Sequence, residues 1–182
     1  METFDSYLSK AELLAAFREL DRRLHTDRIT ADLFIFGGAA LVLGYEARPG
    51  TRDVDAIWRP HGAVLKHAWD IGMERGWPKS WLNDQATAYL PSGFEPVGKV
   101  VYSGNAIRIM RAEPELLLAM KVAALRRRDE PDIRFLAEHL GISNAYEVIA
   151  LAERVLDQPL SDRKRALIED LFPPTISDSS SN

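Results

Sequence analysis

The segment FIFGGAALVLGYEARPGTRDVDAIW, from Phe34 to Trp58, decides how the rest of the chain is interpreted. Its first residues are apolar and end at Gly37 and Gly38, which predicts a buried strand followed by a turn. Small and apolar residues then predict a short helix and, after it, a loop. Asp53 and Asp55 alternate with apolar residues near the end of the segment, which predicts a second strand.

The two aspartates, Asp53 and Asp55, are the strongest chemical signal in this segment. Residues two apart in a strand point to the same face, about 6.5 Å from each other. Two carboxylates in that position repel one another unless a cation lies between them. Mg²⁺ takes oxygen ligands from one or two carboxylates together with substrate phosphates. The pair is therefore a candidate magnesium site, although the same pattern also occurs on the exposed face of an edge strand.

The double glycine at Gly37 and Gly38 is a candidate phosphate-binding turn. Glycine allows a close approach of the backbone to a ligand, and a helix N-terminus presents free N–H groups to a phosphate. Arg48 could bind a triphosphate or remain a surface residue of the loop, and Thr51 could hydrogen-bond the loop before the second strand. An ordinary turn from strand to helix is the alternative for the glycines.

Outside this segment, hydrophobic periodicity predicts several helices and one hairpin. The expected strands cover residues 33–36, 53–58, 99–102 and 106–110, the last two forming the hairpin. The expected helices cover residues 9–24, 39–43, 60–74, 81–90, 114–127, 133–140, 143–156 and 161–171. Ser9 and Glu12 form a capping-box pattern at the start of the first helix. The polar outer face of this helix is expected to be solvated, and it contains Arg18, Asp21, Arg22 and Arg23.

This order of elements predicts an α+β fold, with a small mixed β-sheet packed by helices and a helical C-terminal portion. We expect an α/β core in residues 1–112 and a helical portion in residues 113–172. The last residues, 173–182, are polar and are expected to be disordered.

Composition limits the classes of function. The chain has 182 residues, a net charge of −4 and no cysteine. The acidic balance argues against a generic polyanion binder, and the lack of cysteine excludes disulfides and thiol nucleophiles. No signal-peptide pattern and no run of 18 apolar residues occurs, so we expect a soluble, cytoplasmic protein without membrane contact.

A second charged segment contains Lys121, Arg128, Asp129 and Asp132. Lys121 and Arg128 are seven residues apart, two helical turns, which predicts that they share a helical face. Such cations can bind a triphosphate. The alternatives are a lysine whose stem covers apolar surface and an N-cap role for Asp129.

Together these residues resemble the nucleotidyltransferase superfamily with the polymerase-β-like fold. The resemblance is closer to small prokaryotic AbiEii-type and MenT-type toxins and their uncharacterised relatives. Gly37, Gly38, Asp53 and Asp55 match the first motif of that group. The segment LLAMKVAALRRRDEPDIRFLAEHLG, residues 117–141, looks like its second motif.

The resemblance implies a Mg²⁺-dependent enzyme that moves a nucleoside monophosphate from an NTP to a hydroxyl, with a tRNA 3′ end as acceptor and a cognate antitoxin protein as partner. It implies metal binding by Asp53 and Asp55. The implied nucleotide-binding residues are Gly37, Gly38, Arg48, Thr51, Lys121 and Arg128. Lys121 is also an implied catalytic residue, and Asp129 or Asp132 would complete the acidic site.

One departure from the superfamily pattern leaves alternatives open. Its members usually carry a third carboxylate on a later strand, where this chain has Arg108. The acceptor could instead be a protein hydroxyl or a small molecule such as an antibiotic. The chain could also be a degenerate domain that binds a nucleotide or a partner protein without catalysis.

Overall fold

The structure is a computed structural model that describes residues 7–91 and 93–173. The chain divides into two compact units, Met1–Glu113 and Pro114–Asn182. The first unit contains a mixed β-sheet with helices and the second contains helices, so the predicted α+β class is confirmed. The C-terminal tail is predicted to be disordered. Except for Pro173, its residues lie outside the part of the chain that the structure describes.

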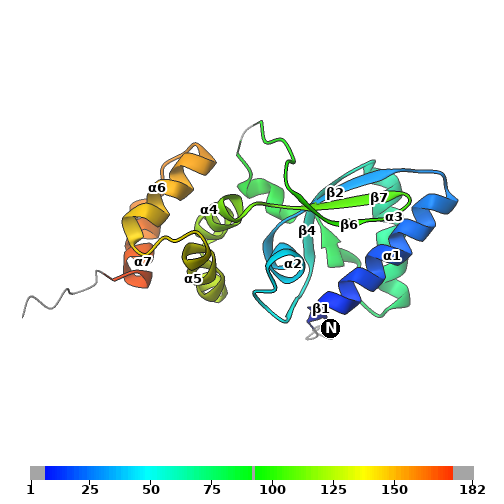
Figure 1. The fold of residues 1–182 in the computed structure, drawn as a ribbon, viewed down its shortest axis with the longest axis horizontal. Coiled ribbons are helices and arrows are strands. Elements are labelled where there is room, and N and C mark those ends of the chain that lie inside the picture. Colours follow the sequence, from blue (N-terminus) through cyan, green and yellow to red (C-terminus); the bar gives the residue numbers. More distant parts are fainter. Residues whose placement is uncertain (1–6, 92, 174–182) are drawn as a thin grey trace, which may run out of the picture. The chain divides into compact units, whose positions relative to one another are not determined.

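A five-stranded sheet forms the centre of the first unit, with the strand order β5-β4-β2-β7-β6 (Figure 1). The strands are β2 (Ala31–Ile35), β4 (Val54–Arg59), β5 (Leu82–Asn83), β6 (Lys99–Ser103) and β7 (Ile107–Arg111). Strand β2 pairs antiparallel with β4 and parallel with β7. The predicted hairpin is confirmed, because β6 and β7 pair antiparallel.

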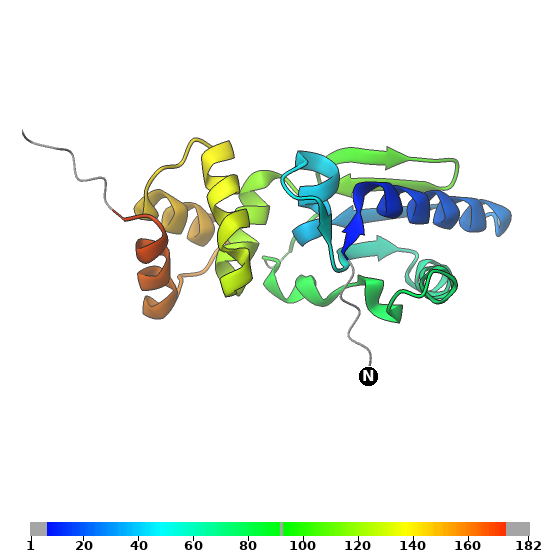
Figure 2. The same ribbon diagram turned by 90° about the horizontal axis from the view of Figure 1, so that it is seen from below.

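Two helices, α1 (Lys10–Thr26) and α3 (His61–Glu74), pack side by side on one face of this sheet. In Figure 2, α1 (blue) runs in roughly the same direction as the strands. In β4, Val54, Ala56 and Trp58 are buried, whereas the alternate residues are less buried. The buried set lies on the face that α1 and α3 cover, because alternate residues of a strand point to opposite faces.

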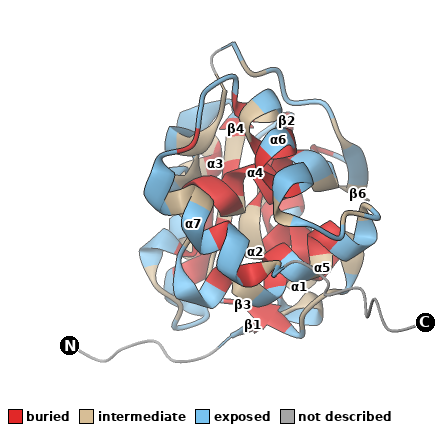
Figure 3. Cartoon of the chain, turned by 90° about the vertical axis from the view of Figure 1, so that its left-hand side faces the viewer, coloured by how far each residue is buried: buried red, intermediate tan, exposed pale blue. Residues whose placement is uncertain are grey.

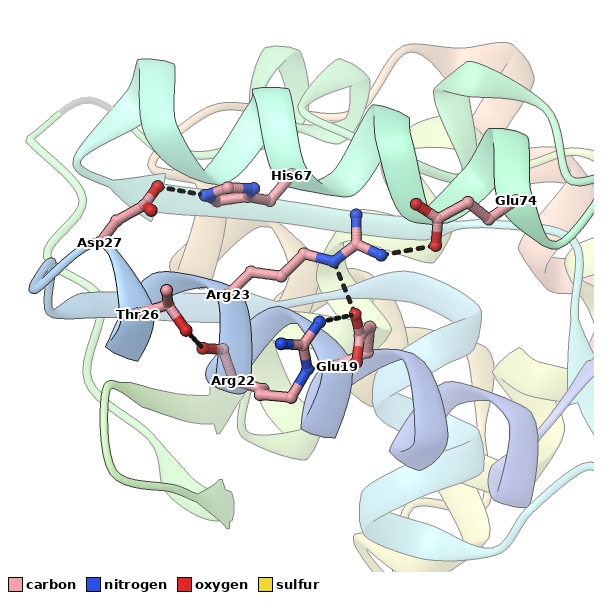
Figure 4. Close-up of polar contacts among 7 residues, drawn as sticks. All are labelled: Glu19, Arg22, Arg23, Thr26, Asp27, His67 and Glu74. Atoms are coloured by element: carbon pink, nitrogen blue, oxygen red, sulfur yellow. Dashed lines mark hydrogen bonds and ion pairs between the residues drawn. The ribbon is translucent and has the colours of Figure 1, made fainter.

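The predicted capping box at Ser9 and Glu12 is confirmed at the start of α1. Polar contacts then join this helix and its C-cap to α3 (Figure 4): Arg23 of α1 pairs with Glu74, and His67 of α3 forms a hydrogen bond of 2.8 Å with Asp27. Hydrogen bonds from Arg22 and Arg23 lower the pKa of Glu19 to about 2.

One prediction for the outer face of α1 is wrong, because Asp21 is buried rather than solvated. Its carboxylate accepts backbone N–H groups of the β6–β7 turn, at 3.1 Å from Asn105, 2.7 Å from Ala106 and 3.0 Å from Ile107. A carboxylate that accepts several hydrogen bonds can stay in the interior without a counter-charge. Asp21 therefore attaches the hairpin to α1.

The helix predicted for residues 81–90 is also wrong. This region contains a 3₁₀ turn (Lys79–Trp81), the short strand β5 and a second 3₁₀ turn (Gln85–Tyr89). The indole of Trp81 is fully buried and donates a hydrogen bond to the Ala68 carbonyl at 2.7 Å. Burial of this large side chain holds the chain against α3, and β5 then pairs with the edge of β4.

The helix after the double glycine begins earlier than predicted. It consists of α2 (Gly37–Ala40), continued by a π-helical turn (Leu41–Tyr45). The loop that follows returns through β3 (Gly50–Thr51), which pairs with β1 (Leu8–Ser9). The N-terminal strand thus fixes the loop that carries Arg48.

The second unit contains four helices among its described residues. They are α4 (Pro114–Ala124), α5 (Glu130–His139), α6 (Ala145–Leu156) and α7 (Asp162–Leu171). Most residues of α4 are buried, and Figure 3 colours this helix largely red. Over residues 7–91 and 93–173, no helix is long and apolar enough to cross a membrane.

Helix α4 ends three residues before the predicted end, which overturns one prediction. Leu125 has a φ of +39° and a 3₁₀ turn (Arg127–Asp129) follows it. Lys121 and Arg128 therefore do not share the face of one helix. A left-handed residue interrupts the helical path between them.

Candidate active site

The glycine turn lies directly against the side chains of the loop and of β4. Gly37 has a φ of +55°, and a Cβ atom there would lie 2.9 Å from Oδ2 of Asp55. A Cβ atom at Gly38 would lie 2.3 Å from Oγ1 of Thr51. Both positions therefore require glycine, the first for its backbone conformation as well. The structure thus brings the glycine turn together with Thr51 and Asp55.

Arg48 belongs to the same cluster. Its Nε donates to the Gly50 carbonyl at 2.9 Å, and its Nη1 lies 3.4 Å from the position of a Cβ atom at Gly38. Thr51 Oγ1 donates to the Asp53 carbonyl at 3.1 Å. These contacts hold a guanidinium beside a glycine backbone, an arrangement that suits a phosphate.

Asp55 lies on the sheet face opposite α1 and α3, because Val54 and Ala56 on either side of it point toward those helices. The backbone of Asp55 accepts a hydrogen bond from Phe36 N at 2.8 Å, which ties β4 to the residue before the glycine turn. Asp53 is half-buried and lies one residue before β4. Strand pairing therefore does not test the prediction that both carboxylates share a face.

A magnesium site at Asp53 and Asp55 stays a prediction. Among the described residues, no group of three or more acidic, histidine or cysteine side chains could hold a metal ion. Strand β7 contributes Arg108 and Arg111 instead of an acid. Two carboxylates nevertheless suit Mg²⁺, which is bound by one or two carboxylates while water and phosphate oxygens complete its octahedron.

The predicted residues of the second unit form a cluster of their own. Lys121 Nζ lies 2.5 Å from Asp129 Oδ1 and 2.9 Å from Asp132 Oδ2, and all three side chains are largely buried. Asp129 also accepts the backbone N–H of Arg126 at 3.3 Å, but it makes no side-chain cap of α5. Arg128 is exposed on the 3₁₀ turn. The cluster links α4 to the start of α5.

Sequence reasoning missed a buried arginine at the end of β7. The guanidinium of Arg111 lies over the ring of Tyr45 at 4.2 Å and donates to Glu113 at 3.0 Å. A Cβ atom at Gly44 would lie 2.1 Å from Arg111 Cδ, so this glycine admits the arginine. The sequence did not single it out, because Tyr45, over whose ring the guanidinium lies, is 66 residues away in the chain.

A protein-family model described as a nucleotidyltransferase of unknown function (DUF6036) matches residues 11–160. The chain belongs to this family. The match includes both charged clusters and supports the predicted nucleotidyltransferase superfamily. A closer kinship between this DUF6036 member and the AbiEii-type or MenT-type toxins stays a prediction. No curated protein and no solved structure matches the chain.

Proposed function

We propose that this DUF6036 protein is a Mg²⁺-dependent nucleotidyltransferase that moves a nucleoside monophosphate from an NTP to an acceptor hydroxyl. The acceptor oxygen forms a bond to the α-phosphorus, the bond to the bridging oxygen breaks, and pyrophosphate leaves. The hydroxyl proton passes to a carboxylate or to water. The close approach of the Gly37–Gly38 turn to Asp55 and Thr51 carries the proposal, because it joins a phosphate-binding backbone to a candidate metal ligand.

The residues of the first unit have separate roles in this proposal. The backbone of Gly37 and Gly38 receives the phosphates, and Arg48 neutralises part of their charge. Asp53 and Asp55 would hold Mg²⁺, which would supply charge stabilisation at the transferring phosphoryl group. Catalysis by such a site depends mainly on positioning and on electrostatic stabilisation.

The acceptor and the biological setting are further parts of the proposal and rest on the sequence resemblance alone. We assign a tRNA 3′ end as acceptor and a toxin–antitoxin system as setting, with an antitoxin protein as partner. We also propose Lys121, Asp129 and Asp132 as catalytic residues. In the structure, the Lys121 ammonium forms ion pairs with both aspartates.

The test is a transfer assay with each α-labelled NTP, Mg²⁺ and total tRNA. Label should move to tRNA, and Asp55→Asn should lower the rate at least about 100-fold. Asp84→Asn is the matched control, because Asp84 is an exposed aspartate of the same unit and should leave the rate unchanged. Label on protein or small molecules alone would reject tRNA as the acceptor.

One observation favours a second candidate, a nucleotide-binding domain without catalysis. The described residues contain no third acid beside Asp55 that could complete a metal group. This candidate predicts that Asp55→Asn changes NTP binding in calorimetry while no NTP supports transfer to any acceptor. Transfer that depends on Asp55 would eliminate it.

A further inference from the structure

Side chains on the sheet face that carries Asp55 are arranged in rows across neighbouring strands. Phe34 of β2 pairs with Ile57 of β4 and with Met110 of β7. Directly paired residues point to the same face, so these three form one row, here called the apolar row. Ile57 lies two residues after Asp55, so this row begins about 6.5–7 Å along β4 from Asp55, here called the acidic site.

The next row on the same face is charged. Asp32 pairs with Arg59 of β4 and with Arg108 of β7, and these three residues are called the basic row. Arg108 Nε donates to Asp32 at 2.7 Å, and all three side chains are exposed. Two guanidinium groups against one carboxylate leave an excess positive charge. Acidic site, apolar row and basic row thus follow one another along β4.

A cavity of about 460 Å³ lies over the apolar and basic rows. Its outer wall comes from Phe94 and Pro96, and the Phe94 ring centroid lies 5.4 Å from that of Phe34. The wall is held close to the sheet, because a Cβ atom at Gly98 would lie 2.0 Å from the Arg111 carbonyl. The volume is in the range of small-ligand sites.

We infer that this cavity binds a nucleotide of the acceptor strand, with its base against Phe94 and the half-buried Ile57 and Met110, and its 5′ phosphate at Arg59 and Arg108. The inference rests on the proposed function and assigns a nucleic acid as the acceptor class. Bases stack on aromatic and apolar side chains, and arginine binds phosphate oxygens bidentately.

The basic row distinguishes an acceptor strand from the base of the donor NTP. If the triphosphate of an NTP lies at the glycine turn, the base at its other end carries no phosphate that could bind the basic row. A strand carries a phosphate on every nucleotide and so matches the cations at the far end of the cavity. A second cavity of about 470 Å³ shares Asp32, Arg59 and Arg108 and extends to the β6–β7 turn, where further nucleotides fit.

The test is calorimetric binding of 5′-phosphorylated dinucleotides to the full chain, without NTP or Mg²⁺. Arg59→Gln and Phe94→Leu should each weaken binding about tenfold. Arg59→Gln should also reduce the slope of log K against log salt by about 0.7, the value for one lost single-strand phosphate contact. Arg18→Gln, an exposed arginine of α1, and Phe135→Leu of the second unit are the matched controls and should bind like wild type.

Three results would overturn the inference. The dinucleotides could fail to bind at millimolar concentration, the two cavity variants could bind them as the controls do, or, in a separate NTP titration, those variants could weaken NTP binding instead. Circular dichroism checks that each variant is folded. Since this assay contains no NTP or metal, its failure is separate from that of the proposed function, which fails if Asp55→Asn retains transfer.

Discussion

Replacing Asp21 tests whether a single carboxylate holds the β6–β7 hairpin on α1. It is 7% exposed and accepts N–H groups from Asn105, Ala106 and Ile107. In Asp21→Ala, Asn105 is exposed and its N–H can bind water, whereas Ala106 and Ile107 are buried. Each buried donor left without a partner costs about 1–3 kcal/mol. We expect a loss of about 3 kcal/mol, because water can reach part of the vacated space from the exposed turn.

Asp21→Asn separates hydrogen bonding from charge. The Asn Oδ1 atom can still accept from Ala106 and Ile107, which both donate to Oδ1 of Asp21. Its amide group would replace Oδ2, which accepts from exposed Asn105. The expected loss is about 1 kcal/mol, the difference between a charged and a neutral acceptor.

Urea unfolding followed by tryptophan fluorescence measures these losses. All four tryptophans lie between residues 58 and 81, so the signal reports the first unit alone. With a slope of about 1–3 kcal/mol per molar urea, a loss of 3 kcal/mol lowers the midpoint by about 1–3 M. The control is Asp32→Ala, an exposed aspartate whose surface pair with Arg108 contributes about 0–1 kcal/mol. If Asp21→Ala costs no more than this control, the assignment of Asp21 as the anchor of the hairpin is wrong.

Three further variants test the two clusters and the α1 surface. Gly38→Ala places a Cβ atom 2.3 Å from Thr51 Oγ1, so we expect a loss of about 1–3 kcal/mol in urea unfolding and weaker NTP binding in calorimetry. Lys121→Met removes the buried ion pairs with Asp129 and Asp132, which should cost about 3–5 kcal/mol and appear as a lower melting temperature by circular dichroism. The pKa of Glu19, lowered to about 2, makes its ionised form stabilising above pH 4.5. Glu19→Gln should therefore cost about 1 kcal/mol at pH 7, and the difference from wild type should disappear as the pH falls from 4.5 toward 2. Unchanged stability of Gly38→Ala would contradict the close packing of Gly38 on Thr51, and unchanged stability of Lys121→Met would contradict the stabilising role of its ion pairs. A pH-independent effect of Glu19→Gln would contradict the lowered pKa of Glu19.

Local patterns were sufficient for elements whose signal lies within a few residues. The capping box at Ser9, the strand before Gly37 and the β6–β7 hairpin are confirmed, because caps, apolar runs and turn residues act over short distances. The close approach of the glycine turn to Asp55 follows from the antiparallel pairing of β2 with β4, which places the end of one strand beside the start of the other.

Predictions failed where a distant partner determined the outcome. Asp21 has the spacing of a surface residue in α1, but the N–H groups that it accepts are more than 80 residues away. The segment after Trp81 has a helical composition, yet burial of its indole against α3 holds it extended at the sheet edge. Helix propensity contributes less than 1 kcal/mol per residue, so burial of a tryptophan overrides it.

The order of acidic site, apolar row and basic row depends on the register of β2 against its neighbours. Asp32 lies opposite Arg59 and Phe34 lies opposite Ile57 only in the observed pairing. A slip by one residue would turn Asp55 toward α1 and α3 and bring Trp58 out to the other face. Burial of Val54, Ala56 and Trp58 under these helices opposes that slip. The helices on one face therefore determine which side chains line the cavity on the other.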